Sequence, residues 1–287
     1  MSRLKSNSSI LIFFMAILLS NKVLAQYPPN ATRYNEAYGS AKSLTGKIKV
    51  IDIFISDDKK GWSDEDKKLA LAKQEYGHRW VQEQARKYNP ESNLEFNVSV
   101  IGEEHDIKVK EVFASRTPGG INLISWILPA IGYKSSKSFY DSLMIADSSD
   151  NVFVMIFAKK TGRAFSQPLW YKTDRNAERF LEATIVYTEG YGDEILNIGT
   201  IVHEMLHLFG AWDIYSDKTS GQTYQVQKSA IDVFGNSVMI NSHKVITELN
   251  IDKLTAWTVG LTNNYMGWFD FFRPRVDPNA PRIGEIK

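Results

Sequence analysis

The sequence contains no cysteine among its 287 residues. Disulfides, thiol nucleophiles, thiolate metal sites and a cysteine-based latency switch are therefore excluded. The chain also lacks an excess of charge of one sign, because its formal net charge is only +1. No basic field therefore points to a nucleic-acid partner. Histidine is scarce, with five residues in the chain. Stability must come from the burial of apolar side chains, with a contribution from a metal if the chain holds one.

The N-terminal apolar run, "ILIFFMAILLS" at residues 10–20, is too short to span a bilayer comfortably. It follows Arg3 and Lys5 and precedes the small-residue sequence "VLA" at residues 23–25. This pattern is typical of a secretory signal peptide, here residues 1–25, with Gln26 as the first mature residue. We expect a secreted or periplasmic protein with no stable membrane insertion after cleavage. An uncleaved membrane anchor is the alternative.

The remaining chain divides into a polar lead-in at residues 26–46, one domain at 47–272 and a Pro-rich tail at 273–287. Apolar, β-branched or alternating stretches predict strands, and amphipathic stretches predict helices. The predicted strands are 47–56, 94–100, 106–113, 151–158 and 182–188, and the predicted helices are 64–88 and 193–209. Strands and helices alternate in the first part of the domain, which favours an α/β layered fold.

The helix at 64–88 has the clearest local signals. Ser63 begins "SDED", a pattern in which the serine caps the helix and Asp66 closes a capping box. Leu69, Ala72, Tyr76 and Trp80 follow at spacings of three and four residues. That spacing predicts that they form the buried face of the helix.

The stretch "IVHEMLHLFGAWDIY" at residues 201–215 carries the strongest functional signal. His203 and His207 are four residues apart and so lie on one face of a helix, where both imidazoles can reach a single point. Glu204 lies beside them and can contact a water on a metal without ligating it. The surrounding residues are apolar, so these polar groups need partners, and a zinc ion supplies them.

Two residues downstream strengthen this interpretation. Gly210 ends the helix, where glycine readily adopts a left-handed turn, and Asp213 follows three residues later. Such a turn can bring Asp213 back to the metal as a third ligand. An H-E-x-x-H pattern arises by chance in a chain of this length on the order of one time in a hundred.

The segment "HEMLHLFGAWD" resembles the extended zinc motif of the metzincin metallopeptidases, in the snapalysin-like variant with Asp at the last position. The resemblance implies an α/β (α+β) fold. Its N-terminal subdomain, to about residue 210, has a twisted mixed β-sheet with long helices. An active-site helix and a small, mostly helical or irregular C-terminal subdomain follow, and residues 248–260 are the candidate for the C-terminal helix that the resemblance implies. It also implies a structural methionine turn beneath the zinc. Met239 in "NSVMIN" is the candidate, with Met266 as a rival.

The resemblance further implies a secreted zinc endopeptidase. His203, His207 and Asp213 would hold Zn²⁺, and Glu204 would act as general base on the zinc-bound water. The substrate would be a protein or peptide, bound in extended form along a strand edge for which "NVFVMIFAKK" at 151–160 is the candidate. We expect a monomer. Structural Ca²⁺ is compatible with a secreted peptidase, but the sequence assigns no residues to it.

Several alternatives stay open at this point. Glu248 would be the third ligand in a gluzincin-type peptidase, and His243 is a further ligand or cleft candidate. Tyr215 and Tyr265 are candidates for contact with the metal water. A non-catalytic zinc-containing binding or adhesion protein is the rival from another class. Structural zinc sites usually have four protein ligands, whereas this motif supplies three and a base.

Overall fold

A computed structural model describes residues 39–57, 61–113, 122–145, 148–168, 181–189, 196–216 and 222–273. The predicted signal peptide, most of the lead-in and residues 274–287 of the predicted tail lie outside the described residues. No helix in the described part of the chain is both long enough and apolar enough to cross a lipid bilayer.

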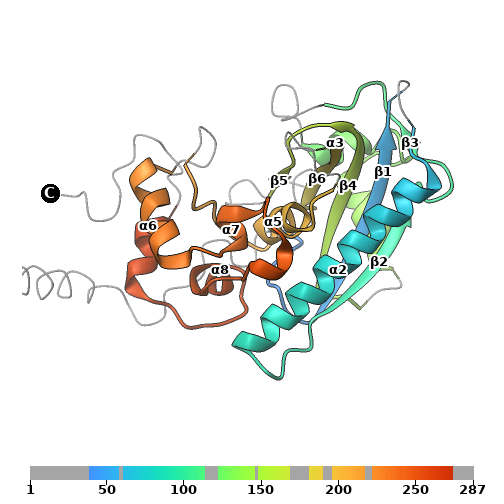
Figure 1. Cartoon of the computed structure of the whole chain (residues 1–287). Coiled ribbons are helices and arrows are strands. Elements are labelled where there is room, and N and C mark those ends of the chain that lie inside the picture. Colours follow the sequence, from blue (N-terminus) through green and yellow to red (C-terminus); the bar gives the residue numbers. More distant parts are fainter. Residues whose placement is uncertain are drawn as a thin grey trace, which may run out of the picture.

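The N-terminal part is built on a six-stranded, mainly parallel sheet (Figure 1). The strand order is β2-β1-β4-β6-β5, and β3 pairs with β1 beyond the end of β2. The strands are β1 (Lys47–Ser56), β2 (Glu95–Ile101), β3 (Ile107–Lys108), β4 (Asn151–Thr161), β5 (Phe165–Gln167) and β6 (Ala183–Glu189). The predicted strands are therefore confirmed, although only two residues of the 106–113 prediction form one.

The position of β4 corrects one prediction. We expected the 151–160 stretch to form the edge of the sheet, but β4 pairs with β1 on one side and β6 on the other. Its residues are almost all buried, as the continuous apolar run requires for a central parallel strand. The edge beside the histidine helix is the short β5, which runs antiparallel to β6.

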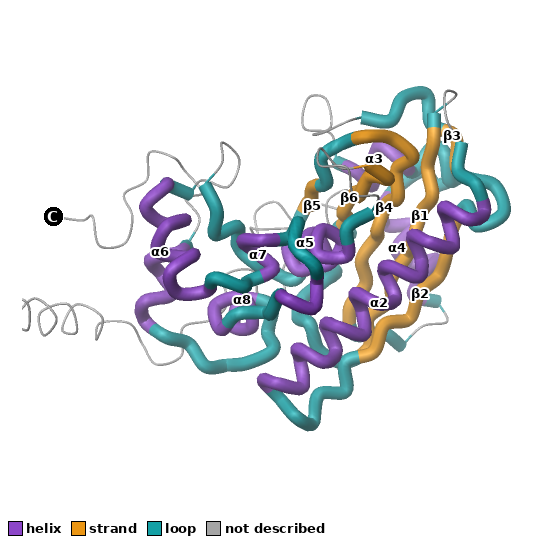
Figure 2. The backbone as a smooth tube through the Cα atoms, in the orientation of Figure 1, coloured by secondary structure: helices purple, strands orange, loops and turns teal. Residues whose placement is uncertain are grey.

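Helices cover both faces of the sheet (Figure 2). One face packs against α2 (Asp64–Tyr88) and α5 (Ile198–Leu208). The other packs against α3 (Leu123–Ile127) and α4 (Ser136–Met144). The predicted mixed α/β architecture is confirmed, but α2 is the one long helix of this part within the described residues.

Helix α2 has the predicted bounds and cap, because the Ser63 side chain accepts a hydrogen bond from the Asp66 backbone N–H. Its buried face, however, differs from the prediction. Leu69 and Tyr76 are 42% and 39% exposed, and of the four predicted residues only Trp80 is buried. The residues that are buried are Lys67, Ala70, Gln74, Gly77, His78, Trp80, Val81, Gln84 and Ala85.

Close packing and specific polar partners explain this choice of face. A Cβ atom on Gly77 would lie 3.0 Å from Cγ2 of Val202 on α5, so only a small residue fits at the crossing. Lys67 is buried because its Nζ donates hydrogen bonds to the carbonyl oxygens of Gly102 and Glu103, each at 2.8 Å. His78 stacks on Phe96 at 4.1 Å between ring centroids, and burial lowers its pKa to about 3.

Downstream of α5 the described chain is helical, with α6 (Tyr224–Phe234), α7 (Val238–Asn241), η4 (Ile246–Glu248), α8 (Lys253–Thr258) and η5 (Gly267–Phe272). These elements lie together beside the end of the sheet, as Figure 1 shows. The helix predicted at 248–260 is shorter than expected, because Asp252 caps α8 by accepting from the backbone N–H of Thr255. The stretch from 248 to 252 contributes the end of η4 and a bridge to Ser237 instead.

A buried carboxyl group in β1 leads to a prediction about stability. Asp52 is fully buried and accepts a hydrogen bond from Nε2 of Gln74 at 2.7 Å, while its other oxygen has no partner among the described residues. Burial raises the pKa of Asp52 from 3.8 to about 8, against the opposing effect of the Gln74 hydrogen bond. Between these pH values the folded state binds a proton that the unfolded state has lost.

We therefore expect stability to fall as pH rises from about 4 to about 8. The Asp52→Asn variant, neutral at all pH values, should be more stable than the wild type by a few kcal/mol at pH 8. The difference should shrink at pH 4, where the folded-state group is protonated and the unfolded-state group is already about half protonated. Urea unfolding of both proteins at the two pH values, with chelator present, measures this. An equal difference at both pH values would mean that Asp52 is not protonated in the fold.

Candidate metal centre

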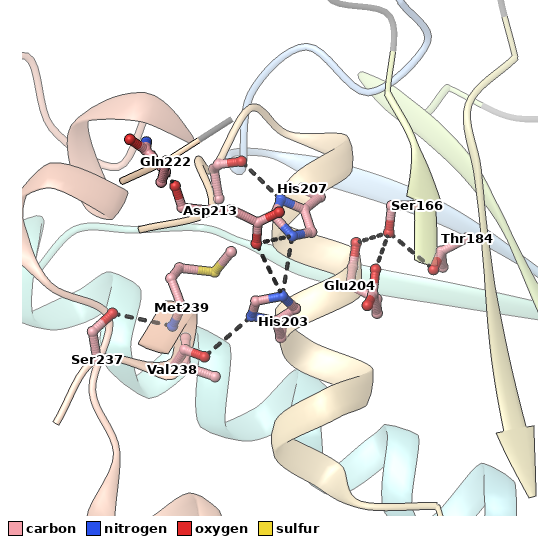
Figure 3. Close-up of polar contacts among 11 residues, drawn as sticks. Ser166, Thr184, His203, Glu204, His207, Asp213, Gln222, Ser237, Val238 and Met239 are labelled. Carbon is pink, nitrogen blue, oxygen red and sulfur yellow. Dashed lines mark hydrogen bonds and ion pairs between the residues drawn. The ribbon is translucent and has the colours of Figure 1, made fainter. Parts of the chain in front are cut away.

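Helix α5 and the turn after it bring the three predicted ligand residues together (Figure 3). The helix begins at the cap residue Asn197, whose side chain accepts from the backbone N–H of Thr200. Gly210 has φ +101°, a left-handed conformation that glycine adopts without strain. The chain turns there, and Asp213 returns toward His203 and His207. The helix is thus shorter at its start than the predicted 193–209.

The three ligand atoms form a compact triangle. The Nε2 atoms of His203 and His207 are 3.1 Å apart. Oδ1 of Asp213 lies 3.5 Å from Nε2 of His203 and 3.1 Å from Nε2 of His207. A tetrahedral zinc ion with ligand distances of about 2.0–2.1 Å separates its ligand atoms by roughly 3.3–3.4 Å. The triangle therefore fits one zinc ion with an open fourth position.

The hydrogen bonds on the far side of each ring set the protonation pattern. Nδ1 of His203 lies 3.2 Å from the carbonyl oxygen of Val238, and Nδ1 of His207 lies 2.8 Å from that of Ala211. A carbonyl only accepts, so both Nδ1 atoms carry a proton, and Nε2 is the atom that each ring offers to a metal. Carbonyl partners of this kind orient histidines that bind metals.

The charges of the group also favour a cation. Two lone pairs and a carboxylate oxygen that face one another repel unless a positive charge lies between them. Burial alone lowers the pKa of His207, but the carboxylate of Asp213 outweighs it and the pKa rises to about 9. Burial likewise tends to raise the pKa of Asp213, yet His207 and His203 hold it well below its ordinary value. The donor set and its electrostatics thus fit a divalent metal.

Glu204 lies beside the histidines on α5, and its carboxylate is directed toward the edge strand (Figure 3). Its Oε2 accepts a hydrogen bond from Oγ of Ser166 at 2.6 Å. The other oxygen, Oε1, has no hydrogen-bond partner among the described residues and is not sealed from solvent. Its carboxylate also contributes to the raised pKa of His207, which places the negative charge close to the histidines.

Helix α7 supports the histidines from the C-terminal part. Met239 is fully buried, and its side chain points toward the ligand group in Figure 3. Its backbone N–H donates to the hydroxyl of Ser237, and the preceding carbonyl, that of Val238, is the partner of His203. The loop after α7 closes against the start of α5, where a Cβ on Gly199 would lie 2.3 Å from the Ser242 carbonyl oxygen.

The other candidates from the sequence lie elsewhere. Glu248 is exposed in η4 and does not belong to the metal-binding group that the described residues form. His243 is exposed, and only its carbonyl oxygen is used, as the acceptor of an Asn197 amide hydrogen bond at 3.1 Å.

Tyr265 donates to Asp270 in an aromatic cluster, and Met266 occupies the N-cap position of η5. His105 is exposed.

Tyr215 is the candidate that does lie near the ligands, with its ring centroid 6.0 Å from that of His203. Ser166, Thr184 and the carbonyl groups of Val238 and Ala211 belong to the hydrogen bonds around the candidate site, and the sequence did not indicate them. Backbone carbonyls carry no sequence signal. A serine in a three-residue strand has none either.

A small cavity of about 60 Å³ lies between the segment that joins β4 to β5, strand β6 and the first turn of α5, one helical turn before Glu204. Its lining is mostly small or apolar: Gly162, Ala164, Val186, Tyr187, Leu196, Asn197, Thr200 and Ile201. Leu196, the residue before the cap of α5, has a positive φ of 50°. The backbone of a leucine is strained in that conformation, so contacts with the surrounding residues must hold the start of α5 in place.

No protein-family model matches the chain, and no curated protein matches it significantly. The chain is similar in fold to a solved structure described as metalloproteinase-II from Bacteroides fragilis, with 11% sequence identity and a TM-score of 0.37. The match covers 85% of this chain and 60% of that protein, so the chain spans less than two thirds of that protein's length.

Proposed function

We propose that the protein is a zinc-dependent peptidase of the metzincin type, with Asp213 as the third ligand. The observation that carries the proposal is the single group formed by Nε2 of His203, Nε2 of His207 and Oδ1 of Asp213, with Glu204 on the same helix. Three ligands leave one position of a tetrahedral ion open, which is the arrangement of catalytic rather than structural zinc.

When bound, zinc would supply a Lewis acid that lowers the pKa of a water and polarises the scissile carbonyl group. The protein's own residues do the rest. His203, His207 and Asp213 hold the ion, and the carbonyls of Val238 and Ala211 keep the imidazoles in the binding tautomer. Glu204 takes a proton from the attacking water through Oε1 and later gives it to the leaving amine.

The edge strand β5 supplies a place for the substrate backbone. β5 is the last strand in the order of the sheet and pairs with β6, so no described strand lies on its other side. An extended peptide can dock there by main-chain hydrogen bonds. β5 contacts α5 through Ser166 and Glu204, so a peptide on this edge lies near the base. We therefore propose a protein or peptide substrate that is cleaved at internal peptide bonds, as by an endopeptidase. The predicted signal peptide supports an extracytoplasmic location.

Removing the metal tests the proposal. Purified residues 26–287 should hydrolyse casein, lose activity with a zinc chelator and regain it when one equivalent of zinc is restored. Circular dichroism before and after chelation shows whether the fold persists. Zinc binding with no hydrolysis of casein or of a mixed peptide library would support a binding protein instead.

A further inference from the structure

Ser166 connects the edge strand to the residue proposed as general base. Its Oγ lies 2.6 Å from Oε2 of Glu204 and 2.7 Å from the backbone carbonyl oxygen of the same residue. A third oxygen, Oγ1 of Thr184 on the neighbouring strand β6, lies 3.1 Å away. Figure 3 shows the three residues side by side, with Glu204 directed at the strand.

The donors in this cluster can be counted. Ser166 has one hydroxyl proton, and Thr184 has one. The Thr184 hydroxyl has its own acceptor, the carbonyl oxygen of Phe165 at 3.2 Å. The Ser166 proton is therefore available to Glu204, and a carboxylate is a stronger acceptor than a neutral carbonyl. Ser166 thus makes a charge-assisted hydrogen bond to Oε2 in a partly buried setting.

This bond selects one orientation of a flexible side chain. A glutamate on a helix has three rotatable bonds, and the bond to Ser166 is the only side-chain hydrogen bond that Glu204 makes among the described residues. With Oε2 held on the strand, Oε1 is the oxygen left for a reactant. The same serine belongs to the edge strand on which we propose that a peptide docks.

We infer that Ser166 is a positioning residue, which holds the Glu204 carboxylate against β5 so that Oε1 faces the reacting water while a peptide docks on the same strand. This inference rests on the proposed peptidase function. It goes beyond the zinc motif, because Ser166 lies 37 residues before His203 in a strand that has no motif.

The test compares Ser166→Ala, which lacks the hydroxyl, with Ser166→Thr, which keeps it. Ser99→Ala, an exposed serine on β2, is the matched control. We expect Ser166→Ala to lower kcat about ten- to a hundred-fold with KM changed less than about two-fold, because the lost bond orients a group used in the transition state. Ser166→Thr should recover most of kcat. Zinc content should stay at one per chain in all variants.

Crystal structures of the same variants give a readout that does not depend on activity. The Glu204 carboxylate should occupy one position in the wild type and Ser166→Thr, and a different position or several positions in Ser166→Ala. An unmoved carboxylate, a wild-type kcat in Ser166→Ala, or a threonine variant as slow as the alanine variant would each overturn the inference. If the wild type hydrolyses no peptide, the proposed function fails, and the carboxylate positions alone then decide what Ser166 does.

Discussion

Replacing Glu204 with glutamine should lower kcat for peptide hydrolysis about 10²- to 10⁴-fold, the range that a general base contributes. Glutamine keeps the size of the side chain and an oxygen that can accept from Ser166. It cannot accept the proton of the attacking water. The ligands lie on other side chains, so the variant should bind one zinc per chain with wild-type affinity. Steady-state kinetics with zinc analysis on the same samples measures both.

The matched control for this change is Glu75→Gln, an exposed glutamate on α2 that pairs with Arg79. A surface ion pair of this kind contributes little, so this variant should keep wild-type activity. Retention of more than a tenth of kcat in Glu204→Gln would mean that another group takes the proton. Loss of zinc from it would mean that Glu204 has a ligand role.

Replacing Asp213 with alanine should weaken zinc binding more than about 100-fold, since changes to groups that only orient ligands already cost 10- to 100-fold. The alanine variant removes one of three donors and the negative charge that balances the ion. Activity should fall in parallel at zinc concentrations near the wild-type Kd and return in part at saturating zinc. Competition with a chromophoric chelator gives the affinity.

A surface aspartate serves as the control for Asp213. Asp141 pairs with Lys137 on the exposed face of α4, and its change to asparagine should leave zinc affinity unaltered. The comparison with Glu248→Ala is also decisive, because Glu248 is the third ligand in the gluzincin alternative. If Glu248→Ala loses zinc and Asp213→Ala keeps it, the ligand set proposed here is wrong.

The sequence predicted the features that depend on residues close together in the chain. The helix at 64–88 and its Ser63 cap depend on local spacing and hydrogen bonding, and the structure has both. The same holds for the ligand group, because four residues of helix and one glycine turn are enough to bring His203, His207 and Asp213 together. Local geometry decided these features, so no distant contact was needed to predict them.

The predictions that failed depended on distant contacts. Whether 151–160 lies at the centre or the edge of the sheet is decided by β6 and β5, which follow it in the chain. The buried face of α2 is decided by Gly77 against Val202 and by the partners of Lys67 and Gln74, not by apolar spacing. The contact between Ser166 and Glu204 depends on β5 lying beside α5, which the sequence does not show.

We propose that His203, His207 and Asp213 together hold one zinc ion. The most direct measurement is anomalous X-ray diffraction at the zinc absorption edge, from crystals grown with one equivalent of zinc. We expect one strong peak at about 2.0–2.1 Å from both Nε2 atoms and at about 2.0–2.2 Å from Oδ1 of Asp213. A crystal with no peak beside these atoms, or with the ion bound at Glu248 or His243 instead, would contradict it.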